Sequence, residues 1–489
     1  MQACDLSATE ARLLIGSKKL SPVELLDSCL QRIEQVNSQL NGVVAIGHER
    51  ARQDAKAAEL AVMRGETLGL LHGLPIAIKD TVNTAGLRTT YGSPVFRDHV
   101  PDRDDAIVAN MRRAGGNVCM KTNLPEWAAG GNTFNPVYGV SGNPFAPHLS
   151  CGGSSGGSAI ALATGMVPLA HGSDNAGSLR IPASICGVVG MRPTGGLVPS
   201  KERPFGLSHF LVEGPMGRTV RDTLLFLAAL ADDDSIDPLA GHLDPALRPD
   251  ARAADLSTLR LAVSDDLGGF APIEDNLRQV FRERVATFAA SFRSNATAAP
   301  YLDRADRVYE VLRGVTFVGI WADRFREHPD KWGRLVTQNY HAGLKLTVEE
   351  IAEANMQFTK IYRAAQTFFN EHDLLITPTM GVYPWPKHDI YPAKVGNHTT
   401  SNYFDYVRMT YAITLLNHPS ISIPCGVDDR GLPFGLQLIA PRGKDAFLMQ
   451  AAMALEDVLQ RNPLTARPIP DIDWLKKQPV EDPLAQPVK

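Results

Sequence analysis

The sequence predicts an α/β protein in which helices cover both faces of a central mixed β-sheet. From about residue 68 to residue 232, short apolar runs such as residues 74–78 and 188–190 alternate with helical patterns and glycine-rich turns. Such alternation is typical of a sheet with helices on both sides. The chain has 489 residues, more than a single core usually holds, so we expect one large domain with a smaller addition, or two domains.

The N-terminal segment, residues 1–66, is expected to be helical and to pack on this core. Ser7 and Glu10 have the spacing of a capping box, and Ser21 followed by Pro22 is a typical helix start. Apolar residues then recur at helical spacing. The sheet and its first helices are expected in residues 67–232.

The rest of the chain is expected to be mostly helical over residues 233–410 and to complete the core with strands and a helix over residues 411–489. An irregular segment at residues 380–410 is rich in proline and aromatic side chains, and the tail beyond Pro463 is expected to be an extended wrap or a frayed end. Further strands are predicted at residues 259–265, 374–379, 420–425 and 434–439.

Composition excludes several classes of protein. The chain is 44% hydrophobic and 21% charged, with a formal net charge of -4 and no basic block, so we expect a globular protein that does not bind nucleic acid. No run of about 18 apolar residues and no secretory signal is found, so no membrane association is expected. The 6 cysteines are scattered and the 13 histidines do not form ligand pairs with them, so we expect a cytoplasmic protein with no metal site.

A glycine-rich run at residues 151–158, with the sequence CGGSSGGS, is the most informative segment. Its glycines disfavour the middle of a helix or strand and allow close approach of the backbone to other groups. A phosphate-binding loop is one alternative, but the Gly-Lys-Ser/Thr ending of such loops is missing. A flexible linker is another, but residues 159–163 continue as an apolar helix.

A second glycine-rich turn at residues 171–182 places Ser178 after a predicted strand, where a nucleophile could stand. The backbone N–H groups of Asn175, Ala176, Gly177 and Ser178 could together stabilise a developing oxyanion. A structural serine after glycine is common, so this turn alone would be weak evidence.

Lys79 ends the apolar run Pro75–Ile78. A lysine at a strand end is more often solvent-exposed than a buried base, and Lys121 stands at a similar strand end. Lys79 becomes informative only in combination with the two glycine-rich segments.

Lys79, the CGGSSGGS run and the GSDNAGSLRIPA run, in this order, resemble the amidase signature family, and Ser154 and Ser178 have the separation of the family pattern. The resemblance covers most of the chain from about residue 5 to residue 460. It also includes KTNLPEW (121–127), NPF (143–145), GPMGRTVRDT (214–223), LLITPT (374–379) and the segment 417–441. It implies an amidase-signature fold with a twisted mixed sheet, in which residues 67–232 are the core that carries the catalytic residues.

The resemblance implies a role for each catalytic position. Ser178 matches the acylating nucleophile, Ser154 matches a serine that follows a cis peptide bond, and Lys79 matches the base. A lysine base must be neutral, so its pKa must fall well below about 10.4. Proton transfer along this relay allows Ser178 to attack an amide carbonyl and then water to cleave the acyl-enzyme, with no metal or organic cofactor.

The neighbours of the relay are candidates for support. Ser155 is expected to hydrogen-bond near Lys79, and Asp174 and Arg180 are expected either to form a buried pair that fixes the loop or to be plain surface charges. The sequence departs from the family at Asn175 and Ala176, where glycine or threonine and then glycine are frequent. Cys151, where proline is frequent, is expected to be an inert buried thiol.

Substrate selection is expected from the variable region 233–410, which includes a lid. Its aromatic side chains suggest an apolar pocket for aryl, alkyl or cyclic amides, although any one of them is more often a core residue. The candidate pocket residues are Trp321, Tyr340, Tyr383 and Trp385.

Several alternatives stay open. Carbamate or ester hydrolysis would use the same acyl-enzyme. The glutaminase subunit of a tRNA-dependent amidotransferase belongs to the same family, but it needs partner subunits and usually has glutamine where Ile181 follows Arg180. A catalytically inactive scaffold is disfavoured by the intact Lys79, Ser154 and Ser178. The expected partner is a small-molecule amide, and the resemblance suggests a homodimer with residues 1–66 as a candidate dimer contact.

Overall fold

The computed structural model describes residues 2–241, 243–485 and 488. Within them, one mixed sheet has eleven strands. Their order across the sheet is β1 (Val43–Ile46), β3 (Asn117–Thr122), β2 (Pro75–Lys79), β8 (Leu169–Asp174), β10 (Val212–Gly217), β9 (Val189–Arg192), β16 (Ser420–Val427), β17 (Pro433–Ile439), β13 (Leu374–Pro378), β11 (Arg260–Val263) and β12 (Ser294–Thr297). Strand β2 runs parallel to β3 and β8, β11 runs parallel to β12 and β13, and the other neighbours are antiparallel.

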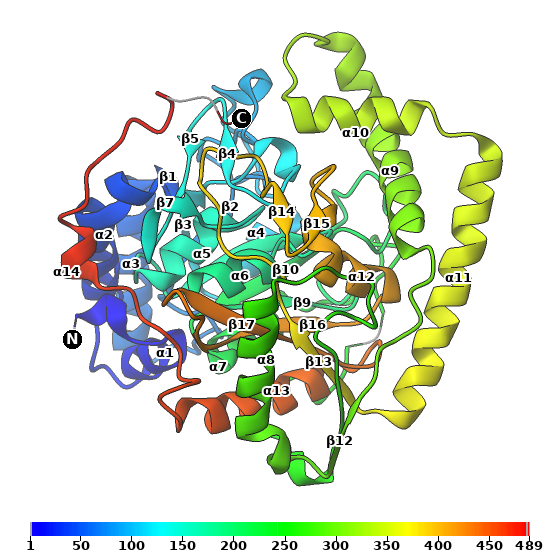
Figure 1. Ribbon diagram of the computed structural model, residues 1–489. Coiled ribbons are helices and arrows are strands. Elements are labelled where there is room, and N and C mark those ends of the chain that lie inside the picture. The colour runs from blue at the N-terminus through cyan, green and yellow to red at the C-terminus, as the bar shows by residue number, and fades with distance from the viewer. Residues whose placement is uncertain (1, 242, 486–487, 489) are drawn as a thin grey trace.

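The helices surround this sheet (Figure 1). The α-helices are α1 (Ala8–Gly16), α2 (Pro22–Leu40), α3 (His48–Arg64), α4 (Ala106–Arg113), α5 (Gly156–Ala163), α6 (Arg180–Cys186), α7 (Val220–Leu230), α8 (Asp275–Phe288), α9 (Ala305–Glu327), α10 (Arg334–Leu344), α11 (Val348–Glu371), α12 (Arg408–Leu416), α13 (Asp445–Gln460) and α14 (Ile472–Leu475). Short 3-10 helices lie at η1 (Ala3–Asp5), η2 (Pro94–Phe96), η3 (Glu126–Ala128), η4 (Leu256–Thr258), η5 (Ala289–Ser291) and η6 (Asp405–Val407). Small two-stranded sheets pair β4 (Phe134–Asn135) with β5 (Gly139–Val140), β6 (Gly142–Asn143) with β7 (Ala146–Ser150), and β14 (Lys394–Val395) with β15 (His398–Thr399).

Alternate residues of the central strands enter two different apolar cores. Ala77 belongs to one core with residues of α5, α6 and α12, whereas Ile76 and Ile78 belong to another with residues of α1, α7 and α13. In β13, Leu375 belongs to the first core, whereas its neighbours Leu374 and Ile376 belong to the second. Side chains thus alternate between two buried faces of the sheet, which confirms the predicted sheet covered by helices on both faces.

The N-terminal segment differs from its predicted helical character. Strand β1 lies within it and pairs antiparallel with β3, so the segment contributes an edge strand to the sheet. The run Val43–Ile46 is short and partly β-branched, and tertiary pairing with β3 overrides the surrounding helical pattern. The predicted helix starts are confirmed, since the capping boxes at Ser7 and Ser21 are both formed.

The outer parts of the chain have distinct positions. Helices α9, α10 and α11 project together beside the sheet, and the segment after α13 runs across the surface past α14 toward β4 and β5 (Figure 1). The backbone N–H of Val140 donates to the carbonyl of Pro483 at 3.0 Å, so the proline-rich tail is a wrap over the core.

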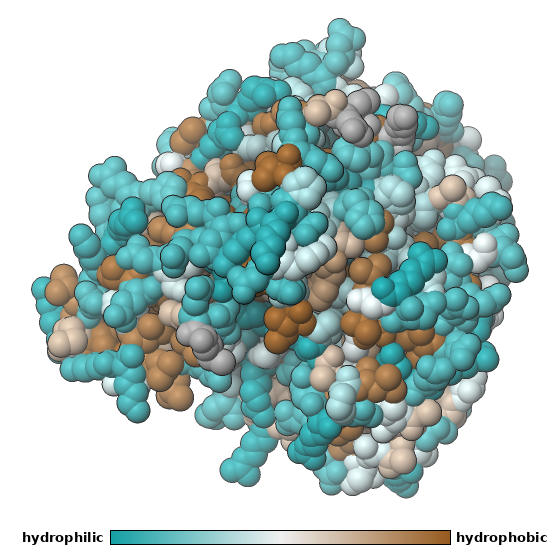
Figure 2. Space-filling model, turned by 60° about the vertical axis from the view of Figure 1, so that its left-hand side comes forward, coloured by the Kyte–Doolittle hydropathy of each residue, from teal (hydrophilic) through white to brown (hydrophobic). Residues whose placement is uncertain are grey.

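The surface drawn in Figure 2 is mostly hydrophilic, with hydrophobic residues in separate small groups. In the described residues no helix has the length and apolar character needed to cross a membrane. The same part of the chain contains no cluster of three or more His, Cys, Asp or Glu side chains placed to hold a metal ion.

Candidate active site

Lys79 is the last residue of β2 and is completely buried. Its Nζ donates hydrogen bonds to the hydroxyl of Ser154 at 2.7 Å and to the hydroxyl of Ser173 at 2.9 Å. Strand β2 lies beside β8, which ends next to Ser173, so the sheet itself brings the amine to the two glycine-rich turns.

Burial lowers the pKa of Lys79 to about 7. The nearby carboxylates of Glu213 and Asp174 act in the opposite direction but do not offset the loss of hydration. Near neutral pH a substantial fraction of Lys79 is therefore neutral and able to accept a proton.

Ser154 and Ser155 stand where the glycine-rich run enters α5. The peptide bond between Gly153 and Ser154 is cis. The N–H of Ser155 donates to the carbonyl of Ser178 at 3.2 Å, and its hydroxyl donates to the carbonyl of Ser173 at 3.3 Å. Close packing explains the glycines, since a Cβ at Gly157 would lie 2.3 Å from the backbone nitrogen of Asn123. The two turns are thus tied directly to each other.

Ser178 lies in the short turn between β8 and α6 and is partly exposed, unlike Lys79 and Ser154. Gly177, directly before it, has a φ of 120°, and a Cβ there would lie 2.4 Å from the hydroxyl oxygen of Thr410. Among the described residues, the Ser178 hydroxyl has no hydrogen-bond partner. The structure therefore joins Lys79 to Ser154, and the link from Ser154 to Ser178 stays a prediction.

The backbone donors of this turn are not equivalent. The N–H of Gly177 donates to the Asp174 carboxylate at 2.9 Å. The N–H groups of Asn175, Ala176 and Ser178 have no partner within the described chain. These three N–H groups are therefore the ones that the geometry leaves for an oxyanion.

Asp174 and Arg180 form a buried ion pair, and a second arginine joins it. The Asp174 carboxylate accepts from Arg180 at 3.0 Å through both Nε and NH2, and Arg192 lies 3.4 Å away. These two guanidinium groups hold the pKa of Asp174 well below its usual range despite complete burial. Because Asp174 also accepts from the backbone of Gly177 and Leu179, the ion pair fixes the turn that carries Ser178.

The comparisons with known proteins identify the family of the chain. The amidase family model matches residues 24–449, which is most of the chain. The chain belongs to the amidase signature family. It is 32% identical over 463 residues to an acylamidase of Rhodococcus erythropolis, with 93% of this chain and 95% of the relative covered. It is 31% identical over 476 residues to a glutamyl-tRNA(Gln) amidotransferase subunit of Alkaliphilus metalliredigens, with 90% and 94% covered.

A solved structure gives the same fold. The crystal structure of a bacterial aryl acylamidase of the amidase signature family superposes with a TM-score of 0.85 at 27% identity, covering 99% of both chains. The chain is thus an amidase, a hydrolase of amide C–N bonds.

A cavity of about 340 Å³ reaches Asn175, in the turn that carries Ser178. Ser173 and Asn175 line it on the catalytic side, and Trp127 and Trp321 form part of its wall, with their ring centroids 4.3 Å apart. Trp127 and the adjacent Ala128 have φ values of 53° and 57°, a left-handed conformation that non-glycine residues adopt rarely and that is common at functional sites.

The predicted pocket residues have different positions. Trp321 lines the cavity, whereas Tyr340, Tyr383 and Trp385 do not. Tyr340 stacks on Phe325 at a centroid distance of 4.0 Å. The hydroxyl of Tyr383 donates to Asp429, and Trp385 is buried with its indole N–H donated to a backbone carbonyl. A contact of these three side chains with substrate stays a prediction.

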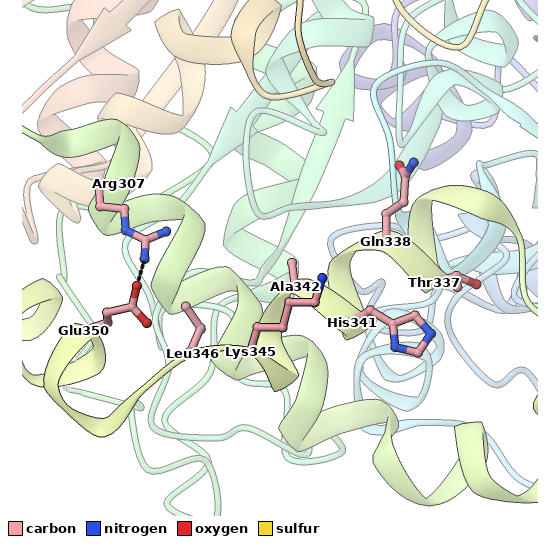
Figure 3. A pocket seen from close by; sticks show the side chains of 8 residues that line it. All are labelled: Arg307, Thr337, Gln338, His341, Ala342, Lys345, Leu346 and Glu350. Atoms are coloured by element: carbon pink, nitrogen blue, oxygen red, sulfur yellow. Dashed lines mark hydrogen bonds and ion pairs between the residues drawn. The ribbon is translucent and has the colours of Figure 1, made fainter.

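A larger surface hollow of about 470 Å³ lies elsewhere, between α9, α10 and the start of α11 (Figure 3). It contains the ion pair between Arg307 and Glu350 but none of Lys79, Ser154 and Ser178. Unlike the first cavity, it also lacks Ser173 and Asn175, so it lies apart from the turn that carries Ser178.

Other side chains of the site carried no signal in the sequence. Ser173 gives Lys79 a second hydroxyl partner, and the Thr410 hydroxyl donates to the carbonyl of Ala176 at 2.5 Å. Arg313 and Tyr309 reach Asn175 from α9. The only hint in the sequence is Arg313 itself, a lone charge within an otherwise apolar stretch of helix. Cys151 is completely buried, which raises its thiol pKa to about 12.

Proposed function

We propose that this amidase hydrolyses carboxylic amides with aryl, alkyl or cyclic groups through an acyl-enzyme on Ser178. The observation that carries the proposal is the buried hydrogen bond from Lys79 to Ser154, with the pKa of Lys79 lowered to about 7, beside a partly exposed Ser178. The aromatic wall of Trp127 and Trp321 supports an apolar substrate body.

In the proposed mechanism, neutral Lys79 accepts a proton from Ser154, which accepts one from Ser178. The Ser178 oxygen attacks the amide carbonyl, and the N–H groups of Asn175, Ala176 and Ser178 stabilise the oxyanion. The proton returns through Ser154 to the nitrogen as the C–N bond breaks and the amine leaves. Water then gives a proton to the relay and attacks the acyl carbon, which releases the carboxylic acid and restores Ser178.

The test combines a fluorophosphonate probe with a panel of aryl amides, carbamates and esters. Wild-type protein should be labelled and should turn over at least one amide, whereas Ser178→Ala should do neither. A wild-type protein that is not labelled and hydrolyses no amide would overturn the proposal. The relative rates on amides, carbamates and esters rank the alternatives that share the acyl-enzyme.

A glutaminase component of an amidotransferase is the second candidate, because the similarity to the amidotransferase relative extends over almost the whole chain. This function predicts glutamine hydrolysis that depends on partner proteins. Hydrolysis of aryl amides by the purified chain alone, with no activity on glutamine, would argue against it.

A further inference from the structure

Arg313 is a buried cation with no counter-ion. It lies on α9, its exposed fraction is 5%, and no carboxylate of the described chain lies within ion-pair distance of it. By contrast, Arg307, two turns earlier on the same helix, is paired with Glu350 at the surface (Figure 3). A buried charge without a partner is costly, so such a group usually has a function or binds a charge that arrives with a ligand.

Neutral groups hold the guanidinium in place. Its Nε donates to the amide oxygen of Asn339 at 3.1 Å, and its NH1 donates to Asn175 and to the Tyr309 hydroxyl, both at 3.3 Å. Its NH2 has no partner among the described residues. The aromatic ring of Phe317 lies 4.7 Å from the guanidinium carbon. The orientation of Arg313 is thus fixed while one donor group stays free.

The free side of Arg313 belongs to the catalytic cavity, which Arg313 and Asn175 both line. Asn175 is three residues before Ser178 in the same turn. The guanidinium therefore lines the same cavity as Asn175 of the turn that carries Ser178, together with the aromatic wall of Trp127 and Trp321.

The acidic side chains of the cavity have other partners. Asp105 accepts from Asn83, Glu202 accepts from the backbone of Ala106, and Glu213 lies 2.9 Å from His171. Arg203 is paired with Asp237. A further arginine near the outer end of α9, Arg324, lies over Trp127 and Trp321 and has no carboxylate partner in the described chain either. Both arginines without a counter-ion therefore face the same cavity from the same side of α9, since eleven residues are close to three helical turns.

We propose that Arg313 binds a carboxylate of the substrate, so that the preferred amide combines an aryl or alkyl body with one anionic group. The inference rests on the proposed function and specifies its substrate class. A planar guanidinium with a fixed orientation suits a carboxylate, and the low polarity of the surrounding rings strengthens the interaction. Arg324 at the outer end would favour entry of the same anion.

Matched pairs of substrates test the proposal. Succinanilate is compared with the anilide in which an isopropyl group replaces its carboxylate, and para-acetamidobenzoate is compared with para-isopropylacetanilide. The two pairs place the anion on the acyl side and on the amine side. In the wild type, at least one anionic member should have the higher kcat/KM. In Arg313→Met, the ratio of anionic to neutral kcat/KM should fall at least about tenfold, the loss expected for a hydrogen bond to a charged group.

The variants are compared by this ratio, because a change at Arg313 also removes a contact of Asn175. Arg313→Lys should recover part of the preference, since the charge remains. Arg307→Met is the matched control on the same helix, and its ratio should equal that of the wild type. Equal rates within both pairs in the wild type, or an unchanged ratio in Arg313→Met, would overturn the inference.

A binding measurement separates this inference from the proposed function. Calorimetry of the Ser178→Ala protein with benzoate should show binding that is lost in the Ser178→Ala, Arg313→Met double variant. If neutral amides are hydrolysed without any anionic preference and benzoate does not bind, the inference fails and the proposed function stands. If no amide is hydrolysed but benzoate binds through Arg313, the proposed function fails and the anion site stands.

Discussion

At the scale of single residues, the site contains two buried ionisable groups, and their surroundings favour the neutral form of one and the charged form of the other. Lys79 has only neutral hydrogen-bond partners among the described residues, two hydroxyls and the carbonyl of Ser173, and burial brings its pKa down to about 7. Asp174 is just as buried, but Arg180 and Arg192 keep it ionised. One environment leaves an amine that can exchange a proton near neutral pH, and the other leaves a fixed anion that holds the turn carrying Ser178.

Lys79 predicts the pH dependence of the amidase. Because the base must be neutral, kcat/KM should be low where Lys79 is protonated, rise as the pH passes about 7, and level off above it. Stopped assays with a neutral anilide from acid to alkaline pH measure this profile. Lys79→Arg should be inactive throughout, since a guanidinium does not lose its proton. Constant activity on both sides of neutrality would contradict Lys79 as the base.

We expect that replacing Asp174 lowers the stability of the protein. Asp174→Asn leaves Arg180 and Arg192 buried without an anion, and removing one partner of a buried pair costs about 3–5 kcal/mol in the free energy of unfolding. Urea unfolding at neutral pH measures the difference. Asp250→Asn is the control, because its pair with Arg248 is exposed and should contribute nothing measurable.

The sign of the pH dependence follows from the same ion pair. The pKa of Asp174 is held below its ordinary value of 3.8, so its contribution to stability is fully present above that pH. The difference in the free energy of unfolding between the wild type and Asp174→Asn should therefore decrease only as the pH falls below this value. A constant gap down to strongly acidic pH would show that the carboxylate charge is not what stabilises the turn.

At the scale of elements, strand ends and tight turns position the proposed catalytic groups. Strand β2 supplies Lys79, β8 supplies Ser173, and the turn between β8 and α6 supplies Ser178. The sequence could predict Lys79 and Ser178, because Lys79 ends an apolar run and Ser178 lies in a glycine-containing turn after another apolar run, but it carries no signal for Ser173. It could not predict Arg313 or Thr410, which reach the turn from positions 138 and 234 residues away in the chain from Asn175 and Ala176. Contacts of that kind depend on how α9 and α12 pack, which no local pattern specifies.

We expect that the turn before Ser178 does not tolerate a methyl group at Gly177. Gly177→Ala would force a Cβ to within 2.4 Å of the Thr410 hydroxyl oxygen in a backbone conformation that disfavours side chains. The turn should shift, and kcat should fall at least about tenfold, since small displacements of a nucleophile are costly. Steady-state kinetics on a neutral anilide measure the change.

Gly65→Ala is the matched control for this substitution. Gly65 also has a positive φ, of 70°, but an added Cβ would meet nothing within 4 Å. It should therefore reduce stability by about 1–2 kcal/mol from the backbone alone, with kcat unchanged. Equal kinetic effects of the two substitutions would mean that crowding by Thr410 does not matter.

At the scale of the whole molecule, distant segments close the structure around the core. The sequence predicted the sheet with helices on both faces, because both-face burial leaves continuous apolar runs in the central strands. It did not predict β1, since the run Val43–Ile46 is too short to stand out between two helices. From the sequence alone, the tail beyond Pro463 is expected to be either an extended wrap or a frayed end. Its polar contacts include an ion pair between Lys387 and Glu481 at 2.7 Å, and contacts between positions so far apart in the chain leave no local pattern in the sequence.

We expect that a substitution in the tail, far from the candidate active site, lowers the stability of the protein. Leu475 in α14 is completely buried in the same core as residues of α2, so Leu475→Ala should lower the free energy of unfolding by about 2–5 kcal/mol through the cavity it leaves. Leu464→Ala is the same change at a side chain that is 47% exposed and should have a small effect. Thermal and urea unfolding of the two variants measure the difference. Activity of the folded Leu475→Ala protein at low temperature should match the wild type, because α14 contributes nothing to the catalytic cavity. Equal stability of the two variants would mean that the tail rests on the surface without contributing to the core.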